Sequence, residues 1–311
     1  MLSRLKGPAA FRAYQLGEVV SRNAPRALVD PSLQLAARLA TVRGGDKRWV
    51  IERNLRRIYG RDLTRNELNT RVQATYESYA RYYYDSFRLP AMDLGQVAEG
   101  FTVEGIEHLE AAMDNDPVGP ILALPHLGGW EWAAFWITGI RQWKLAAVAE
   151  RLEPPELFEW FLKFRQSLGM NIIPLGPDAA DEVVGAMLDR QIVCLLSDRD
   201  LTGSGPEVDF FGERTSLPAG PAVMHLKGGA TVLPVAVYFT EQGVHGVVRP
   251  PVTIERDPDA VSIRGDVQRF MQVLAGELET LIRRAPEQWH LLQPNWPSDF
   301  ELLGAPRPTL S

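Results

Sequence analysis

The 311-residue chain contains a single cysteine, Cys194. One cysteine can form neither an internal disulfide bond nor a cysteine-based metal site. Cys194 lies in the apolar run at residues 192–196, which is typical of a small buried side chain rather than of a reactive thiol. The sequence is therefore compatible with a reducing environment.

Long hydrophobic runs are also missing. No stretch approaches the roughly 20 apolar residues that a membrane-spanning helix needs. The most apolar stretch, Trp130 to Ile140, is short and carries Glu131. The first residues lack the basic, apolar and small-residue order of a signal peptide. We therefore expect neither a spanning helix nor export.

Several chemical signatures are absent. The chain has no Gly-x-Ser-x-Gly nucleophile elbow, no phosphate-binding loop and no His-x-x-x-His zinc spacing. RNA-binding, helix-turn-helix and zinc-finger signatures are missing too, so we expect no nucleic-acid partner and no metal. His108, His225 and His245 have no companions at ligand or triad spacing and are interpreted as structural or solvated.

The charge is unevenly distributed. Residues 1–61 hold 13 Lys and Arg against 4 Asp and Glu, a net charge of +9. The remaining residues have a net charge of −15, which gives the overall charge of −6. A basic segment on an acidic body indicates a face turned toward a polyanion. An anionic inner-membrane surface is favoured over nucleic acid, which predicts a peripheral protein on the cytoplasmic face of the cell membrane.

The first hundred residues are predicted to be helical, because apolar side chains recur at helical spacing with arginines between them. Such helices can lie in a lipid interface or simply pack on the body, with arginine stems covering apolar surface. We predict a basic helical region at 1–100 that packs on an α/β body at 101–311, the two forming one structural domain. Two further helices in this region are expected at Arg48–Gly60 and Asn66–Phe87.

From Gly119 onward, short apolar runs alternate with helical stretches. Near-continuous apolar strands separated by helices predict an α/β fold with a mostly parallel central sheet flanked by helices on both faces. The expected strands are Pro120–Leu124, Leu145–Ala149, Ile172–Leu175, Ile192–Leu196, Val208–Phe211, Thr231–Phe239 and Val244–Val248. The expected helices are Trp130–Ile140, Pro155–Leu168, Asp178–Asp189, Ala219–Lys227 and Arg264–Arg284.

The main candidate for chemistry follows the first of these strands. His126 is placed just beyond the carboxyl end of a strand, where ligands bind in parallel α/β sheets, and Glu131 follows five residues later. On one continuous helix the two side chains would point about 140° apart. If His126 lies in the loop and Glu131 in the first helical turn, the carboxylate can reach Nδ1 and leave Nε2 free as a base. A hydrogen-bonded loop histidine without function explains the same spacing.

Several ordered blocks resemble the bacterial lysophospholipid and lipid A acyltransferases that carry a His-x4-Asp/Glu motif. The resemblance covers nearly the whole chain from Arg53 onward. Residues 148–152 and 291–294 are similar to the actinobacterial branch that acylates phosphatidylinositol mannosides. The other blocks are His126–Glu131, Phe164–Gly169, Ser197–Asp200, Val208–Gly212, Leu217–Pro221 and Pro286–His290.

The resemblance implies catalytic roles for three residues. His126 matches the catalytic base and Glu131 the acid of the motif, with Glu in place of the commoner Asp. Asp198 matches an acidic partner of the histidine that is usually a glutamate, so its shorter side chain leaves direct contact open. Ion pairing among Asp198, Arg199 and Asp200 is the structural alternative.

The resemblance also implies substrate contacts. Arg165 matches an arginine that lines the acyl-donor site, although an arginine near a helix C-terminus can also simply offset the helix dipole. Glu150 and His290 match polar residues on the acceptor side, and Ser204 falls in a loop near the donor. From its position beside His126, Trp130 is expected to offer apolar surface next to the reacting thioester.

The activity implied is direct transfer of a long-chain acyl group from acyl-CoA to a mannose hydroxyl of a phosphatidylinositol mannoside, with no metal and no cofactor beyond the acyl-CoA co-substrate. Alternatives within the class are a lipid A precursor or a lysophospholipid as acceptor and an acyl carrier protein as donor. An acyl thioesterase and a non-catalytic lipid-binding protein are the alternatives from other classes.

Overall fold

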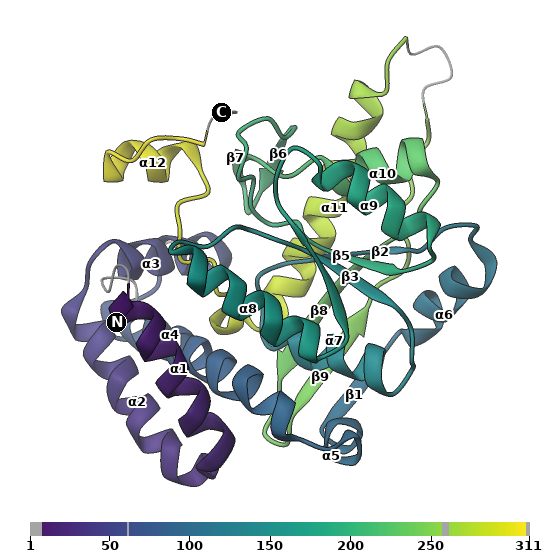
Figure 1. The fold of residues 1–311 in the computed structure, drawn as a ribbon. Coiled ribbons are helices and arrows are strands. Elements are labelled where there is room, and N and C mark those ends of the chain that lie inside the picture. Colours follow the sequence, from purple (N-terminus) through teal and green to yellow (C-terminus); the bar gives the residue numbers. More distant parts are fainter. Residues whose placement is uncertain (1–7, 61, 257–260, 309–311) are drawn as a thin grey trace.

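The computed structural model describes residues 8–60, 62–256 and 261–308, so part of the basic segment, residues 1–7 and 61, lies outside it. The described ranges form the predicted α/β fold, with a mostly parallel sheet between helices and additional helices before it (Figure 1). In the part of the chain that is described, no helix is long and apolar enough to cross a bilayer.

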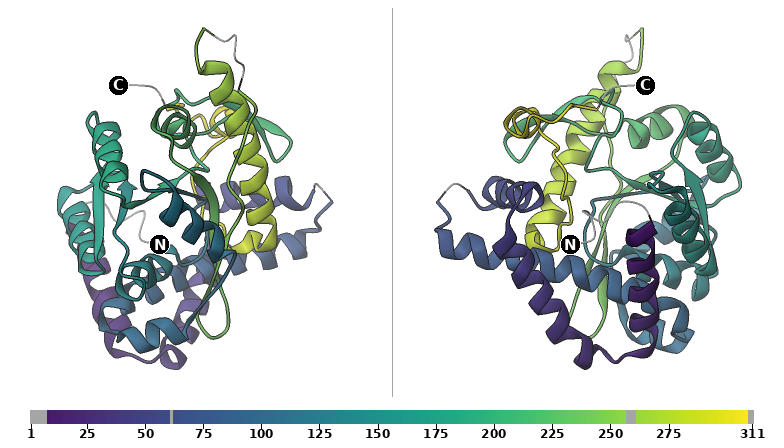
Figure 2. Two further views of the ribbon diagram at one scale, coloured as in Figure 1. Left: turned by 90° about the vertical axis from the view of Figure 1, so that its right-hand side faces the viewer. Right: turned by 60° about the vertical axis from the view of Figure 1, so that its left-hand side comes forward.

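The first four helices form one group at the side of the sheet, seen in purple and blue in Figures 1 and 2. Both of the first two helices pack against the long fourth helix. That fourth helix begins with a capping box, in which Thr64 and Glu67 satisfy each other's backbone N–H groups. The helices of this group are α1 Pro8–Asn23, α2 Arg26–Arg43, α3 Asp46–Tyr59 and α4 Arg65–Arg88. The 3-10 turn Leu89–Ala91 follows them, and α5 Leu94–Glu99 packs against α7 (Trp130–Gly139) and the first strand of the sheet.

Within the described residues the main sheet has seven strands in the order β1-β9-β8-β2-β5-β3-β4. Strands β8, β2, β5, β3 and β4 run parallel, whereas β9 is antiparallel to β8 and pairs in parallel with β1. The strands are β1 Phe101–Glu104, β2 Ile121–Leu124, β3 Leu145–Ala149, β4 Met170–Pro174, β5 Ile192–Leu196, β8 Val232–Phe239 and β9 Val244–Val248.

Helices cover both faces of the sheet, as the apolar strands predicted. Alternate residues of β2 enter different cores: Ile121 and Ala123 pack on one face, and Leu122 and Leu124 on the other. The Leu122 face is covered by α6 Ile106–Asn115, α7 Trp130–Gly139 and α8 Pro155–Ser167, and the Ile121 face by α9 Ala179–Leu188, α10 Gly220–Gly228 and α11 Arg264–Arg284.

One predicted strand lies elsewhere. The run Val208–Phe211 was expected in the alternating series but forms β6 (Glu207–Phe210), which pairs only with β7 (Glu213–Ser216) in a separate hairpin. Its two-residue turn is Phe211-Gly212, and both residues have positive φ, of 51° and 74°. This turn type brings the chain straight back, so the strand pairs with its neighbour in sequence instead of joining the sheet.

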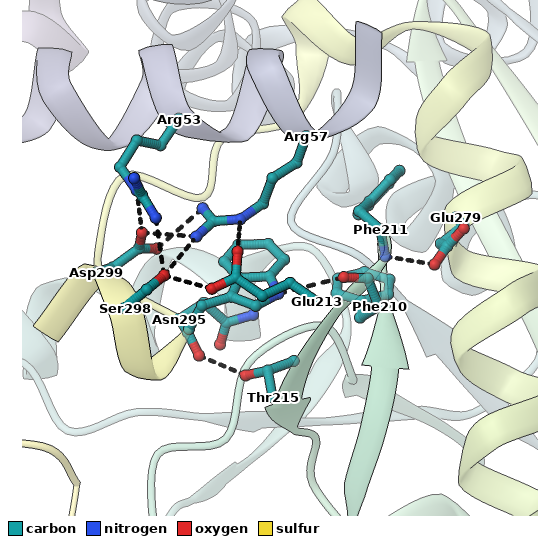
Figure 3. Close-up of polar contacts among 11 residues, drawn as sticks. Arg53, Arg57, Phe210, Phe211, Glu213, Thr215, Glu279, Asn295, Ser298 and Asp299 are labelled. Atoms are coloured by element: carbon teal, nitrogen blue, oxygen red, sulfur yellow. Dashed lines mark hydrogen bonds and ion pairs between the residues drawn. The ribbon is translucent and has the colours of Figure 1, made fainter. Parts of the chain in front are cut away.

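The chain ends in a segment that returns to the carboxyl edge of the sheet, here called the C-terminal strap (residues 286–299). It contains the 3-10 turn Pro286–Gln288 and the start of α12 (Pro297–Leu303). Figure 3 shows how α3 holds it: Arg53 and Arg57 both bind the fully buried Asp299. Arg57 Nη2 lies 2.7 Å from Asp299 Oδ1, and Arg57 Nε lies 2.9 Å from Glu213 of β7. The strap is therefore tied to both α3 and the hairpin.

Candidate active site

The geometry of the site begins with the register of two strands. Strands β2 and β5 are parallel neighbours in which Leu124 pairs with Leu196. His126 and Asp198 each lie two residues beyond this last pair, so both side chains emerge at the same carboxyl edge of the sheet. Nδ1 of His126 lies 2.6 Å from Oδ1 of Asp198, and the backbone N–H of His126 donates to Oδ2 at 2.9 Å. The sequence left open whether Asp198 contacts His126 directly, and this contact is present.

Asp198 is fully buried and satisfied by hydrogen bonds. Besides His126, the indole Nε1 of Trp289 donates to Oδ2 at 2.7 Å. Burial alone would raise the pKa of Asp198, but the facing His126 and these hydrogen bonds outweigh it and lower the pKa below its ordinary value. An ionised Asp198 accepts a hydrogen bond from the N–H group at Nδ1, so the lone pair of the ring lies on Nε2.

Glu131 lies in the first turn of α7, as expected, but the predicted contact with Nδ1 was wrong. Its carboxylate accepts hydrogen bonds from the hydroxyl of Tyr82 at 2.6 Å and from Nη2 of Arg165 at 3.1 Å, with Ser86 at 3.5 Å. The side chain is 1% exposed and faces α4 and α8. Asp198 occupies the Nδ1 side of the ring instead, because the strand register brings it there.

The Glu131–Arg165 pair is a buried charge pair beside the histidine. Burial alone would lower the pKa of Arg165, but Glu131 raises it above its ordinary value, so the guanidinium stays charged. Burial and Glu131 raise the pKa of Tyr82 well above its ordinary value, and its hydroxyl remains a donor. Arg165 also lies 5.1 Å from the ring of Trp130, at cation–π distance.

His126 is 35% exposed and lies between two cavities. The first cavity measures about 330 Å³ and extends toward α1, α4 and α8. The second cavity, of about 350 Å³, extends toward α9 and the start of α10. Five residues line both: His126, Val148, Glu150, Leu196 and Arg199.

The first cavity adjoins a narrow apolar cavity of about 40 Å³ between α7 and the sheet. Leu124, Trp130 and Cys194 line both spaces and separate one from the other. Apart from Gly246, every residue that lines the narrow cavity has an apolar side chain or is Cys194. Burial raises the pKa of Cys194 to about 12, so its thiol stays protonated there.

The predicted substrate residues divide between the cavities. Arg165, Trp130 and His290 line the first cavity, and Glu150 lines both. Ser204 lines only the second, so it does not share a cavity with Arg165. The reason is local, because the loop after β5 folds around Asp200, which accepts hydrogen bonds from Thr202 and Gly205.

The three charged residues after β5 do not pair with one another. Asp198 binds His126, and Asp200 caps its own loop. Arg199 lies 4.0 Å from Glu150 at the junction of the two cavities. Among the described residues, Asp198, Arg199 and Asp200 therefore do not form the ion pairs with one another that the structural alternative predicted.

His290 lies beside His126, the candidate catalytic base. Its backbone N–H donates to the carbonyl of His126 at 2.7 Å, and its Nε2 lies 2.9 Å from the hydroxyl of Ser78. Burial, and next the nearby His126, lower the pKa of His290 to about 3. The ring is therefore neutral at physiological pH and can bind hydroxyl groups as donor or acceptor.

Sequence reasoning assigned no contact to Trp289 or Asn295, which both reach Asp198 from the C-terminal strap. The available signal was the block Pro286–His290, which contains Trp289. Nothing local in that block predicts its partner, because Trp289 and Asp198 are 91 residues apart.

The fold and the site define an α/β protein in which a His–Asp pair at the carboxyl edge of a parallel sheet opens onto an apolar cavity. The chain belongs to the bacterial lipid A biosynthesis acyltransferase family, whose sequence model matches residues 11–298. It is thus an acyltransferase, as the ordered sequence blocks predicted.

Two relatives share most of this length. A phosphatidylinositol mannoside acyltransferase of Mycolicibacterium smegmatis is 38% identical over 299 residues, covering 95% of this chain and 94% of the relative. The protein of that name from Mycobacterium tuberculosis is 36% identical over 293 residues, covering 93% and 89%.

Proposed function

We propose that the protein transfers a long-chain acyl group from acyl-CoA to a mannose hydroxyl of a phosphatidylinositol mannoside, with His126 as general base. One observation carries the proposal: His126 is held by a buried carboxylate through Nδ1 while its ring borders two cavities. Within the described residues Nε2 has no hydrogen-bond partner, so it can accept a proton from a bound hydroxyl.

The reaction follows from this geometry. Nε2 of His126 takes the proton of the acceptor hydroxyl as the oxygen attacks the thioester carbonyl carbon. Asp198 stabilises the imidazolium that forms. The tetrahedral intermediate then expels the thiolate, which takes the proton from Nε2. An ester and a free thiol result, and the protein returns to its starting state.

The protonated state of the Cys194 thiol supports direct transfer without an acyl-enzyme. It is the only cysteine of the sequence and it lines the first cavity, but its raised pKa of about 12 leaves too little thiolate to act as a nucleophile. The hydroxyl of the acceptor is then the attacking group.

The acyl chain is assigned to the first cavity and the narrow apolar cavity behind it. Each buried methylene contributes about 0.8 kcal/mol, so a space lined by apolar side chains binds a long chain tightly. Arg165, held by Glu131, provides a fixed positive charge in the first cavity, and this charge suits the phosphates of a CoA donor.

The acceptor assignment rests on the names of the two relatives and on the polar groups near His126. Glu150 and Arg199 line both cavities, and the neutral His290 lines the first. Ser204 adds a hydroxyl in the second cavity. Carboxylate, guanidinium, imidazole and hydroxyl groups together suit a sugar ring, whose hydroxyls both donate and accept hydrogen bonds.

We place the protein on the cytoplasmic face of the membrane through α1 and α2. Large apolar side chains on these helices remain exposed, and exposed arginines lie among them, a combination that suits an anionic lipid surface. The exposed apolar residues are Leu16, Val19, Val20, Leu28, Leu35, Leu39 and Val42, and the arginines include Arg12, Arg22, Arg38 and Arg43.

Mass spectrometry of lipid products tests the activity. The full chain is incubated with acyl-CoA or an acyl carrier protein thioester and, separately, with a phosphatidylinositol mannoside, a lipid A precursor or a lysophospholipid. We expect acylated mannoside from acyl-CoA, and none from a folded His126→Ala variant. Normal transfer by that variant would contradict the general-base role, and full acyl release without any acceptor would indicate a thioesterase.

A further inference from the structure

Trp289 makes a contact with the catalytic pair that the proposed reaction leaves unexplained. Its side chain is 3% exposed, and its Nε1 lies 2.7 Å from Oδ2 of Asp198. Oδ2 also accepts the backbone N–H of His126, while Oδ1 faces Nδ1 of the ring. With two donors on one oxygen and the imidazole on the other, the carboxylate cannot rotate without losing a hydrogen bond.

We infer that Trp289 is a positioning residue of the active site, which acts through Asp198 by donating its indole N–H to the carboxylate that orients His126. This inference rests on the proposed role of His126 as general base. An indole N–H is a neutral donor that never accepts a proton. It can therefore hold and partly neutralise the carboxylate without competing for the proton on Nδ1.

The backbone around Trp289 is built to hold this contact. The N–H of Gly128 donates to the carbonyl of Gln288 at 3.0 Å, and the N–H of His290 donates to the carbonyl of His126 at 2.7 Å. Trp289 thereby lies opposite Leu127 in a short antiparallel bridge. The loop that carries the base and the segment that carries the indole are thus held as one unit.

The indole ring is also confined by aromatic neighbours. Phe211 lies 5.6 Å from it, and Phe210 and Trp296 lie 6.1 and 6.3 Å away in edge-on arrangements. These rings belong to the hairpin and to the C-terminal strap. The indole N–H is therefore aimed at Asp198 by packing that does not depend on substrate.

A second residue of the strap fixes the backbone of the same aspartate. Nδ2 of Asn295 donates to the carbonyl of Asp198 at 3.0 Å. Figure 3 shows that the carbonyl of Asn295 accepts a hydrogen bond from the hydroxyl of Thr215, in the network that ties Asp299 to Arg57. The strap thus holds Asp198 by both side chain and backbone and is itself anchored to α3 and β7.

Among the described residues, Arg199 and His290 are charged or titratable neighbours of the pair. Asp198 faces His126, and Arg199, which lies near Glu150, interacts with Asp198 only through its charge and not as an ion pair in contact. His126 also faces the neutral His290. If the indole donor is removed, more of the negative charge on Asp198 acts on the ring. The protonated imidazole is then stabilised, and the base becomes available only at higher pH.

The test compares Trp289→Phe with Trp296→Phe in the full chain, using palmitoyl-CoA and a phosphatidylinositol mannoside as probes. Both variants lose a buried indole donor from one aromatic cluster, but Trp296 donates to the carbonyl of Phe210 and not to Asp198. For Trp289→Phe we expect kcat/KM to fall about tenfold, mainly in kcat, with its acid limb moved to higher pH. Trp296→Phe removes the donor to Phe210 but keeps an aromatic ring beside the Trp289 indole, so it should keep the wild-type profile at a similar loss of Tm.

NMR of the Nδ1 proton of His126 gives a readout independent of turnover. Its chemical shift should change in Trp289→Phe and not in Trp296→Phe. Identical profiles and shifts in the two variants would overturn the inference, even if His126→Ala is inactive. If His126→Ala is active, the proposed function itself fails.

If Trp289→Phe does not fold, Asp198→Asn replaces it. The indole N–H resonance of Trp289 should then move while that of Trp296 does not. If both indole resonances move equally, or if neither moves, the inference is overturned.

Discussion

Oδ1 of Asp198 lies 2.6 Å from Nδ1 of His126, although 72 residues separate them along the chain. The carboxylate that is nearest in sequence, Glu131, forms its hydrogen bonds with Tyr82 and Arg165 instead. The two acids at the site therefore have different structural roles, and substitutions should separate them.

The first prediction concerns the acid that contacts the ring. Asp198→Asn keeps the shape of the side chain but removes the charge that stabilises the imidazolium. We expect kcat to fall by about 10² to 10⁴. Steady-state kinetics with far-UV circular dichroism as a folding control tests this. A folded variant with kcat within a factor of three of wild type would exclude the His–Asp pair as the catalytic unit.

The second prediction concerns the buried charge pair. Glu131→Gln leaves the Arg165 guanidinium buried without its carboxylate, so we expect a loss of about 3 kcal/mol in the free energy of unfolding. The KM for acyl-CoA should rise more than kcat falls, because Arg165 is no longer held in place.

A double-mutant cycle with Arg165→Met supplies the control for this pair. In the Arg165→Met background, Glu131→Gln should lower the free energy of unfolding by less than it does in the wild type, because no buried guanidinium is left without a partner. If instead Glu131→Gln lowers kcat as strongly as Asp198→Asn at unchanged stability, Glu131 orients the base and our assignment is wrong.

The third prediction is a pH dependence of stability from His290. Its pKa of about 3 in the folded chain lies below the ordinary value of 6.5. The unfolded chain therefore binds a proton below about pH 6.5 while the folded chain does not. Stability should be highest above this pH and fall by about 1.4 kcal/mol per unit as the pH decreases toward 3.

Chemical denaturation between pH 7 and 4.5 measures this slope. His290→Gln cannot titrate and can still bond to Ser78, so its stability should depend less on pH than that of the wild type. Equal slopes in the two proteins would show that His290 is not the group responsible.

The fourth prediction concerns the acyl chain. Ala134 is 2% exposed and lines the narrow apolar cavity, so Ala134→Leu should shorten the space for the chain. Because each methylene contributes about 0.8 kcal/mol, the donor preference should shift toward acyl-CoA shorter by two or more carbons.

Ala186→Leu is the matched control, since Ala186 is also buried but packs on the opposite face of the sheet and lines none of the three cavities. It should lose stability without a change in chain preference. An unchanged preference in folded Ala134→Leu would place the acyl chain elsewhere.

The fifth prediction concerns the lipid surface. Leu28 and Leu35 are 73% and 58% exposed, and their spacing of seven residues puts them on one face of α2. The double variant Leu28→Glu, Leu35→Glu should bind vesicles containing anionic lipid more weakly in a sedimentation assay. Wild-type binding should itself weaken with added salt.

Two other exposed leucines provide the control for this experiment. Leu188 and Leu302, on α9 and α12, are 67% and 66% exposed, and changing both to Glu should leave vesicle binding unchanged. Equal effects of the two double variants, or binding that does not depend on salt, would argue against α1 and α2 as the membrane face.

The sequence by itself determined the local structure. Helical periodicity predicted α3, α4 and α7 to α11, and short, near-continuous apolar runs predicted most strands of the main sheet, because these patterns reflect which sides of an element are buried. They missed β1, α6, β7 and α12, which are all short elements. His126 was correctly placed beyond a strand, since that position depends only on the residues next to it.

The tertiary structure decided which groups meet. Whether Glu131 or Asp198 contacts the ring depends on the register between β2 and β5, which is set by packing between segments far apart in sequence. The contact from Trp289 depends in the same way on the path of the C-terminal strap. Such partners are chosen by long-range packing, and no local pattern records them.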